Sequence, residues 1–183
     1  MHYTLCDFIL DVFQNGVEAG GTELAVAIRE EDSEVAVMVT DNGPGMDERE
    51  KQRAIDPFYT AGGKHPERRV GLGLPFLAAC AEHVGGSLNI DTAPGIGTTV
   101  QFSLPTACVD TPPLGDMAGT IRVMMCYDRR YEVTVERSRA GRGYVVRRTD
   151  LAEALGELES AGSQTLLRDY LEQNERELHR TED

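Results

Sequence analysis

Residues 34–47 read EVAVMVTDNGPGMD, an alternating run that passes directly into an acidic residue and a glycine-rich turn. The alternation over 34–40 predicts a half-buried β-strand. Asp, Asn, Gly and Pro at 41–45 are ordinary turn residues, so this stretch alone predicts a strand followed by a tight turn. The segments on either side decide whether the turn has a further role.

Two apolar helices flank this strand in the sequence. Residues 3–19 place apolar side chains at helical spacing, and the glycine pair at 20–21 ends the predicted helix. Residues 72–84 have a second apolar helical pattern, which the glycine pair at 85–86 ends. The other predicted elements of this half are strands at 22–30, 33–41, 87–93 and 97–105, a short polar helix at 46–56 and a long loop at 57–71.

The C-terminal third has its own set of predicted elements. Residues 105–119 lack an apolar period and contain three prolines, which predicts a linker at 106–117. We therefore expect one domain at 1–105 and a small α+β unit at 118–183, a candidate interaction module. Its predicted elements are strands at 120–127, 131–138 and 143–149, and helices at 150–160 and 163–180, the last opened by a Ser163 cap.

Composition indicates a globular protein of the reducing cytosol. The chain has 183 residues, 40% of them apolar, which suits one domain with a small appendage. No apolar run approaches the roughly 20 residues that span a bilayer, and the N-terminus lacks a basic leader and cleavage site. The cysteines, which form no CxxC pair, are Cys6, Cys80, Cys108 and Cys126. This spacing favours free thiols over a zinc site or disulfides, so we expect a cytoplasmic protein without membrane contact.

Charge is distributed unevenly along the chain. The net charge of −13 argues against nucleic-acid binding by the whole protein. Residues 120–149 nevertheless hold eight arginines against three acids, and residues 150–183 hold ten acids against three arginines. The simplest interpretation is that two oppositely charged faces of one unit complement each other or a partner.

Five motifs in a fixed order give the chain a specific family resemblance. They are DVFQNGVEAG at 11–20, DNGPGMD at 41–47, DPFYT at 56–60, VGLGLPFLAACAEHVGG at 70–86 and GIGTTVQFSLP at 95–105. Together they resemble the ATP-binding domain of sensor histidine kinases, the gyrase B subunit, mismatch-repair ATPases and anti-sigma-factor kinases, with the histidine kinase pattern the most similar. The resemblance covers about residues 3–105. It implies a two-layer α/β sandwich with a mixed, mostly antiparallel sheet and both apolar helices on one face.

The resemblance implies an adenine site at the turn. Asp41 matches the residue that accepts a hydrogen bond from the adenine amino group, and a guanine carbonyl there would face negative charge. Gly43 and Gly45 would let the backbone pass close under the purine. Either Thr98 or Thr99 would supply a hydroxyl near the same adenine edge.

The resemblance also implies a phosphate site with Mg²⁺. Asn15 matches the residue that binds Mg²⁺ through its side-chain oxygen. The free amides at the start of the second apolar helix would bind the phosphates, with Pro75 well placed in its first turn. The implied phosphate-site residues are Gly71, Leu72, Gly73 and Leu74. Loop 59–70 would be a lid, with Lys64, His65, Arg68 and Arg69 as candidates for the γ-phosphate, or as ordinary solvated charges. Phe58 would pack at the hinge or in the core.

Two positions depart from the family pattern. In ATP-hydrolysing branches a Glu precedes the Asn by four residues, whereas this chain has the shorter Asp11. Asp11 could activate water, support the Mg²⁺ shell or do neither. Arg69 stands where the lid motif often has glycine, which would stiffen the lid or place a cation over the phosphates.

Three functions fit these residues. The favoured hypothesis is a free-standing Mg·ATP-binding regulator that phosphorylates or otherwise controls a protein partner, in the manner of anti-sigma-factor kinases. The motifs begin near Met1, leaving no room for the dimerisation helices of sensor kinases, so we expect any phospho-acceptor on another protein. The alternatives are a conformational ATPase, in which hydrolysis drives lid closure or homodimerisation, and a sensor that binds ATP or ADP without turnover.

Overall fold

The computed structural model describes residues 4–56 and 73–180, which contain six helices and six strands. The helices are α1 (Leu5–Glu18), α2 (Glu48–Ala54), α3 (Gly73–Val84), α4 (Met117–Cys126), α5 (Arg148–Leu155) and α6 (Ala161–Leu178). The strands are β1 (Glu23–Glu30), β2 (Glu34–Asp41), β3 (Ser87–Ala93), β4 (Gly97–Pro105), β5 (Glu132–Arg139) and β6 (Arg142–Arg147).

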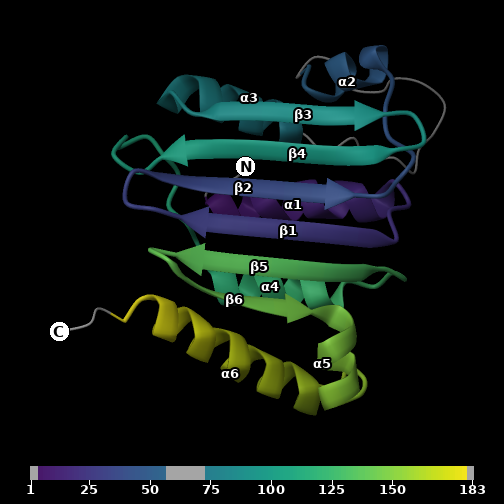
Figure 1. Ribbon diagram of the computed structural model, residues 1–183, viewed down its shortest axis with the longest axis vertical. Helices are drawn as coiled ribbons and strands as arrows, with labels where there is room; N and C mark the ends of the chain where they lie inside the picture. The colour runs from purple at the N-terminus through teal and green to yellow at the C-terminus, as the bar shows by residue number, and fades with distance from the viewer. Residues whose placement is uncertain (1–3, 57–72, 181–183) are drawn as a thin grey trace.

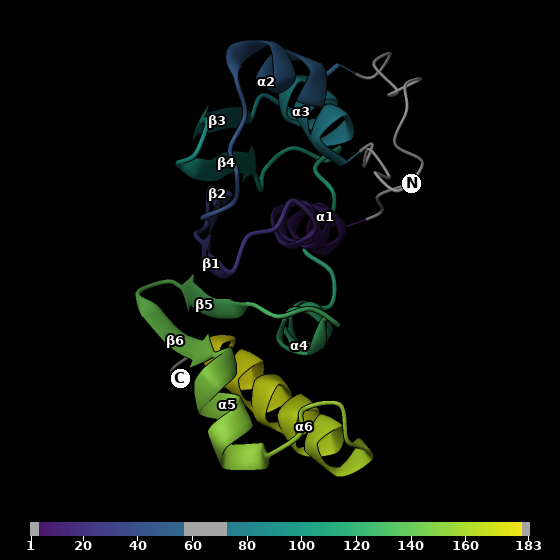
Figure 2. The same cartoon turned by 90° about the vertical axis from the view of Figure 1, so that its right-hand side faces the viewer.

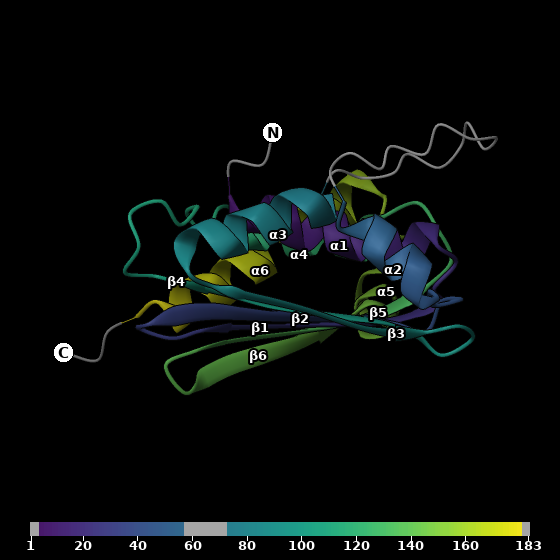
Figure 3. The same cartoon turned by 90° about the horizontal axis from the view of Figure 1, so that it is seen from above.

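All six of these strands belong to one sheet, in the order β3-β4-β2-β1-β5-β6 (Figure 1). β1 and β5 run parallel, and every other neighbouring pair is antiparallel. Figures 2 and 3 show α1, α3 and α4 as a second layer on one face of the sheet. The predicted two-layer fold with a mixed, mostly antiparallel sheet is therefore confirmed.

The alternation in β2 determines which side chains meet the helices. Val35, Val37 and Val39 are buried in the core. The apolar stripe of α1 packs in the same core, where Ile9 and Phe13 are fully buried. Because successive side chains of a strand point to opposite faces, Asp41 continues the helix-facing row of β2. The strand thus carries a carboxylate to the end of the α1 layer.

The segment predicted as a strand at 120–127 is instead helical, within α4. Its buried residues follow helical spacing and are Met117, Ala118, Thr120, Ile121, Met124 and Met125. Asp116 caps this helix by accepting a hydrogen bond from the Gly119 amide at 2.9 Å. In the sequence, Asp116 as an N-cap residue favours a helix, and this preference outweighs the β propensity of the apolar run at 120–127. The predicted Ser163 cap was also wrong, because Ser160 caps α6 and Ser163 donates to the Leu155 carbonyl.

The C-terminal hairpin extends the sheet rather than forming one of its own. β5 pairs with β1 over eight residues, from Glu23–Glu132 to Glu30–Arg139. The predicted linker at 106–117 contains the loop between β4 and α4, and its Pro113 and Leu114 contact the start of α1. The strands on both sides of that loop therefore share one sheet.

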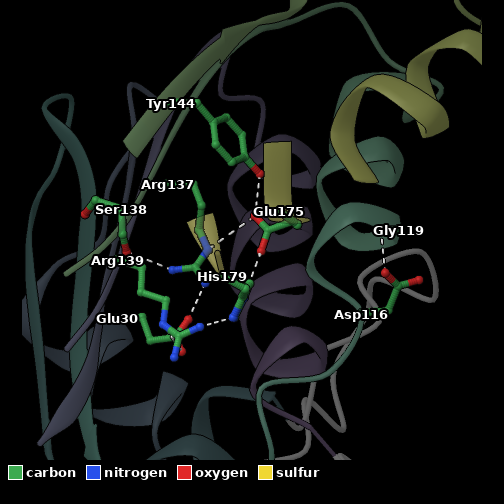
Figure 4. Close-up of polar contacts among 9 residues, drawn as sticks. All are labelled: Glu30, Asp116, Gly119, Arg137, Ser138, Arg139, Tyr144, Glu175 and His179. Carbon is green, nitrogen blue, oxygen red and sulfur yellow. Dashed lines mark hydrogen bonds and ion pairs between the residues drawn. The ribbon is translucent and has the colours of Figure 1, made fainter. Parts of the chain in front are cut away.

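A charged network joins the hairpin to β1 and α6 (Figure 4). Arg137 on β5 is fully buried and forms ion pairs with Glu30 on β1 and Glu175 on α6. Arg139 lies 3.3 Å from the other Glu30 oxygen. Tyr144 on β6 donates a hydrogen bond to Glu175. The basic hairpin therefore pairs with an acid of the C-terminal third, Glu175, and with an acid on β1, Glu30.

Candidate functional site

Helix α1 carries two polar side chains on one face. Asp11 and Asn15 are four residues apart, so they lie one above the other, about 6 Å apart along the helix axis. Both are half-buried. The Asn15 side chain makes no hydrogen bond to any other residue that the structure describes. Its amide oxygen is therefore available to a ligand.

Asp41 lies beneath the C-terminal end of α1, where glycines leave space for it. A Cβ at Gly16 would lie 3.1 Å from the Asp41 Cβ and 3.2 Å from its Oδ2. A Cβ at Gly21 would lie 3.2 Å from the Asp41 Cβ. Larger residues at 16 or 21 would therefore crowd the carboxylate.

The electrostatic environment of Asp41 combines burial with a few backbone donors. Its Oδ1 accepts a hydrogen bond from the Gly43 amide at 2.8 Å. Partial burial raises the pKa of Asp41 above its ordinary value, while hydrogen bonds from the Gly43 and Thr98 backbones oppose that rise. A further donor at the carboxylate would replace lost hydration, which makes Asp41 suited to a ligand with an N–H group.

The turn after Asp41 is held in place by backbone and hydroxyl contacts. The Met46 amide donates to the Thr92 hydroxyl at 3.0 Å. Gly45 has φ of +65° and faces the Ala93 carbonyl so closely that a side chain would collide with it. Asn42 accepts hydrogen bonds from the Thr22 and Glu23 amides at 2.8 and 3.0 Å. Hydrogen bonds and close backbone packing thus fix the turn beside the carboxylate.

The two candidate threonines lie on opposite faces of the sheet. Thr98 is directly opposite Asp41 in the β2–β4 ladder, so both side chains project toward the helix layer. Thr99 is opposite Thr40, and their hydroxyls lie 3.1 Å apart on the other face. The Thr98 hydroxyl lies 3.0 Å from that of Thr92. The geometry places Thr98 beside Asp41 and Thr99 away from it.

The start of α3 meets α1 at Asp11. α3 begins at Gly73, and a side chain there would collide with the Asp11 carboxylate. Leu74 is buried in the core, so its backbone rather than its side chain can face a ligand. The predicted site residues outside the described part of the chain are Phe58, Lys64, His65, Arg68, Arg69, Gly71 and Leu72.

Sequence reasoning missed three residues that shape this site: Gly16, Gly21 and Thr92. Gly16 and Gly21 stood in the sequence as an ordinary helical residue and a helix stop. The available signal was the presence of glycines just after Asn15. Its meaning is clear only when the fold places Asp41 beneath this end of α1. Thr92 gave no signal, because its partners are brought to it by tertiary structure: Thr98 by sheet pairing and Met46 by the turn after β2.

The fold and site together define a two-layer nucleotide-binding type of domain, with an acidic residue and a glycine turn at one end of α1. A family model for histidine kinase-, DNA gyrase B- and HSP90-like ATPases matches residues 4–107, more than half of the chain. The chain belongs to this family, and residues 4–107 form a histidine kinase-like ATP-binding domain.

The chain is similar to proteins named as histidine kinases over part of its length. The signal transduction histidine-protein kinase AfsQ2 of Streptomyces coelicolor is 32% identical over 115 residues, 62% of this chain and 21% of AfsQ2. The sensor histidine kinase component HK1 of Mycobacterium tuberculosis is 34% identical over 95 residues, 52% of this chain and 56% of HK1. The solved catalytic domain of histidine kinase ThkA has 23% identity and a TM-score of 0.44, covering 58% of this chain and 66% of that domain. The chain thus spans about a fifth of AfsQ2 and about half of HK1.

The described residues contain neither a membrane-spanning helix nor a cluster of metal-ligating side chains. No helix within 4–56 or 73–180 has the length and apolar content required to cross a membrane. In the same residues, no three His, Cys, Asp or Glu side chains cluster in a way that could hold a metal ion. A protein-only metal site is therefore not part of the described structure.

Proposed function

We propose that the chain binds Mg·ATP along α1 and acts as a kinase-like ATPase that transfers phosphate to, or otherwise controls, a protein partner. The observation that carries this proposal is the half-buried Asp41 carboxylate, with Gly16, Gly21 and Gly43 packed around it. A carboxylate in this setting takes an N–H donor at low cost, because burial has already removed part of its water.

Adenine is the ligand base that this arrangement fits. The adenine amino group donates to the Asp41 carboxylate, whereas guanine presents a carbonyl that the same carboxylate repels. Thr98, on the same face, supplies a hydroxyl next to that edge. Gly43 keeps the carboxylate uncrowded for the base, because a Cβ at this position would lie 2.7 Å from Asp41 Oδ1.

The phosphates lie toward Asn15 and the start of α3 in this proposal. The Asn15 oxygen would hold Mg²⁺, which prefers oxygen ligands and usually completes its shell with phosphate oxygens and water. Such a site needs no cluster of protein acids, in keeping with the described residues. When bound, Mg²⁺ supplies charge neutralisation for the phosphates. The N-terminal end of α3, where the helix dipole is positive, would supply an anion site.

Asp11 occupies the position where it could act on water or on the Mg²⁺ shell. Its carboxylate faces Gly73 at the start of α3, and Asp11 lies one helical turn before Asn15 on α1. A base must reach within about 3 Å of the attacking water, and Asp is one methylene shorter than Glu. We therefore propose slow hydrolysis at most, with transfer to a partner as the productive reaction.

The relatives support the transfer half of this proposal by their names alone. AfsQ2 is named a signal transduction histidine-protein kinase, and HK1 a sensor histidine kinase component. In this chain, residues 4–107 form the ATP-binding domain. In this chain, the partner and the accepting residue are expected on a second protein.

The experiment is calorimetric titration with ATP, ADP and GTP, with and without Mg²⁺. Asp41→Asn should weaken ATP binding by about 100-fold or more, because a polar edge is then mispaired in a half-buried site. Asp91→Asn, which removes an exposed carboxylate on β3, is the matched control and should bind as the native chain does. Native binding without adenine selectivity, or equal binding by Asp41→Asn, would refute the proposed site.

Turnover is then assigned with γ-labelled ATP. Label appearing on an added acceptor protein supports phosphate transfer. Phosphate release that Asp11→Asn abolishes, without label on a protein, would show a conformational ATPase instead. Binding of ADP and ATP with neither activity would show a nucleotide sensor.

A further inference from the structure

The helix that carries Asp11 and Asn15 is held at its N-terminus by the segment that follows the ATP-binding domain. The first amides of a helix have no partner inside the helix. Here the Leu5 amide donates to the Pro113 carbonyl at 2.9 Å, and the Cys6 amide donates to the Leu114 carbonyl at 3.0 Å. The loop therefore completes the start of α1.

The C-terminal end of α1 is held by the residues that follow α4. The Tyr127 hydroxyl donates to Glu18 Oε1 at 3.0 Å, in the last turn of α1. The Phe13 ring meets Tyr127 and Tyr131 edge-on, with centroids 6.2 and 5.6 Å apart. α1 thus has one polar and two aromatic contacts to this segment near its end.

The position of α1 determines how closely Gly16 packs against Asp41. Gly16 lies two residues before Glu18. A Cβ atom at Gly16 would lie only 3.1 Å from the Asp41 side chain. A shift of α1 by a fraction of an ångström would therefore change the space above the carboxylate. The same shift would move Asn15, the neighbour of Gly16, relative to the nucleotide phosphates.

A second connection reaches the sheet side of the same site. The Glu132 amide at the start of β5 donates to the Thr22 carbonyl at 2.8 Å. Thr22 and Glu23 in turn donate to Asn42, the residue after Asp41. Contacts from the C-terminal third therefore reach both walls of the site, α1 and the turn.

We propose that residues 113–131 form a cradle that positions α1 for the nucleotide, with Tyr127 as a positioning residue. The proposal rests on the proposed function, because the positioned groups are those that would bind Mg·ATP. Linkage makes the effect reciprocal: a cradle that favours nucleotide binding is itself stabilised when the nucleotide binds. The C-terminal third is then a working part of the nucleotide site, and a partner that binds it changes ATP affinity.

The test compares two tyrosine variants by calorimetry with Mg·ATP. Tyr127→Phe keeps the ring but loses the hydrogen bond to Glu18, and should raise the Kd by about 2- to 5-fold. Tyr127→Ala also loses the contact with Phe13, and should raise it by about 10-fold or more. Tyr144→Phe is the matched control, since it loses a hydroxyl that bonds Glu175, far from α1 in the fold. It should leave the Kd within 2-fold even where its stability falls as much.

Hydrogen exchange provides the second readout and separates the two proposals. Saturating Mg·ATP should slow exchange of the α4 amides in the native chain, and slow it less in Tyr127→Phe. Without nucleotide, Tyr127→Phe should speed exchange of the Glu18 and Ala19 amides, whereas Tyr144→Phe should not. If the native chain binds no ATP, the proposed function fails and this last comparison still decides the cradle. The cradle proposal would be overturned if Tyr127→Phe left the exchange rates of the Glu18 and Ala19 amides unchanged. It would also be overturned if Tyr127→Phe and Tyr144→Phe lost equal affinity for ATP.

Discussion

Asp41 and Arg137 are charged side chains that are buried in part or in full, yet their surroundings differ in kind. Arg137 is fully buried, pairs with Glu30 and Glu175, and also donates to the Ser138 carbonyl at 2.8 Å. Asp41 has backbone amides as donors and glycine where other sites would have side chains. Arg137 has oppositely charged partners within the fold, whereas Asp41 has backbone donors and glycine neighbours.

Under the proposed function, the difference separates a structural charge from a charge that binds a ligand. A fully buried ion is tolerated when opposite charges and hydrogen bonds from the protein surround it. A half-buried ion that the protein leaves partly unpaired has a raised proton affinity and costs stability, as the raised pKa of Asp41 indicates. Such a cost is retained where a ligand supplies the missing partner.

The largest expected effect comes from breaking the structural charge. Arg137→Met would leave Glu30 and Glu175 without their shared cation, and should lower the free energy of unfolding by about 3–5 kcal/mol. Urea unfolding measures the change. Arg168→Met removes an exposed arginine that pairs with Asp169 and Glu172 on α6, and should cost at most about 1 kcal/mol. Similar losses in the two variants would mean that burial does not set the value of the Arg137 network.

A smaller effect follows from filling the space around the binding charge. Gly16→Ala places a methyl group against Asp41 and Leu24, and the Asp41 side chain must move to make room. We expect the Kd for ATP to rise about 10-fold, which corresponds to about 1.4 kcal/mol. Gly162→Ala is the matched glycine in α6, where nothing lies within 4 Å, and it should leave binding unchanged. Unaltered affinity in Gly16→Ala would show that a methyl group at position 16 does not obstruct the ligand at Asp41.

Strand alternation gives a third test within one strand. Thr98→Val removes a hydroxyl on the Asp41 face, and should weaken ATP binding by about 3- to 10-fold. Thr99→Val makes the same chemical change on the opposite face and should alter binding by less than about 2-fold. Calorimetry on the two variants distinguishes them. A greater loss in Thr99→Val would contradict the assignment of the site to the helix side of the sheet.

The contrast between the two charges also explains what the sequence could predict. Asp41, Asn15 and the glycine turn could be proposed as site residues from the sequence because they belong to local motifs with fixed spacing. Strand period was sufficient to place Asp41 at the end of β2, but the choice between Thr98 and Thr99 required the register with β2. Register depends on pairing between segments about 60 residues apart, which neither motif nor period specifies.

The C-terminal third was harder for a physical reason. Its apolar run at 120–127 suits either a strand or a buried helix, and the Asp116 cap decides for the helix. The parallel pairing of β5 with β1 is a long-range contact without a local signature. The arginine excess was visible in the sequence, but its meaning depends on Glu30, which lies more than 100 residues from Arg137.

The smallest expected effect is a pH dependence that belongs to Asp41. Its folded-state pKa is raised above the ordinary value of 3.8, mainly by burial, so the protonated form is favoured by folding. The stabilisation from that proton is fully present below pH 3.8 and is lost as pH rises through the folded pKa. Asp41→Asn has no charge to bury, so its stability advantage over the native chain should be greatest at neutral pH and should shrink on acidification.

Chemical unfolding of both proteins between pH 7 and the acid range measures this difference. Asp91→Asn, compared in the same way, accounts for the loss of an exposed carboxylate. A gap between Asp41→Asn and the native chain that stays constant with pH, or widens toward acid, would contradict a raised pKa. The Asp41 carboxylate would then have enough hydrogen-bond donors within the protein, as Glu30 and Glu175 have at Arg137. Asp41 would in that case lack no donor for a ligand to supply.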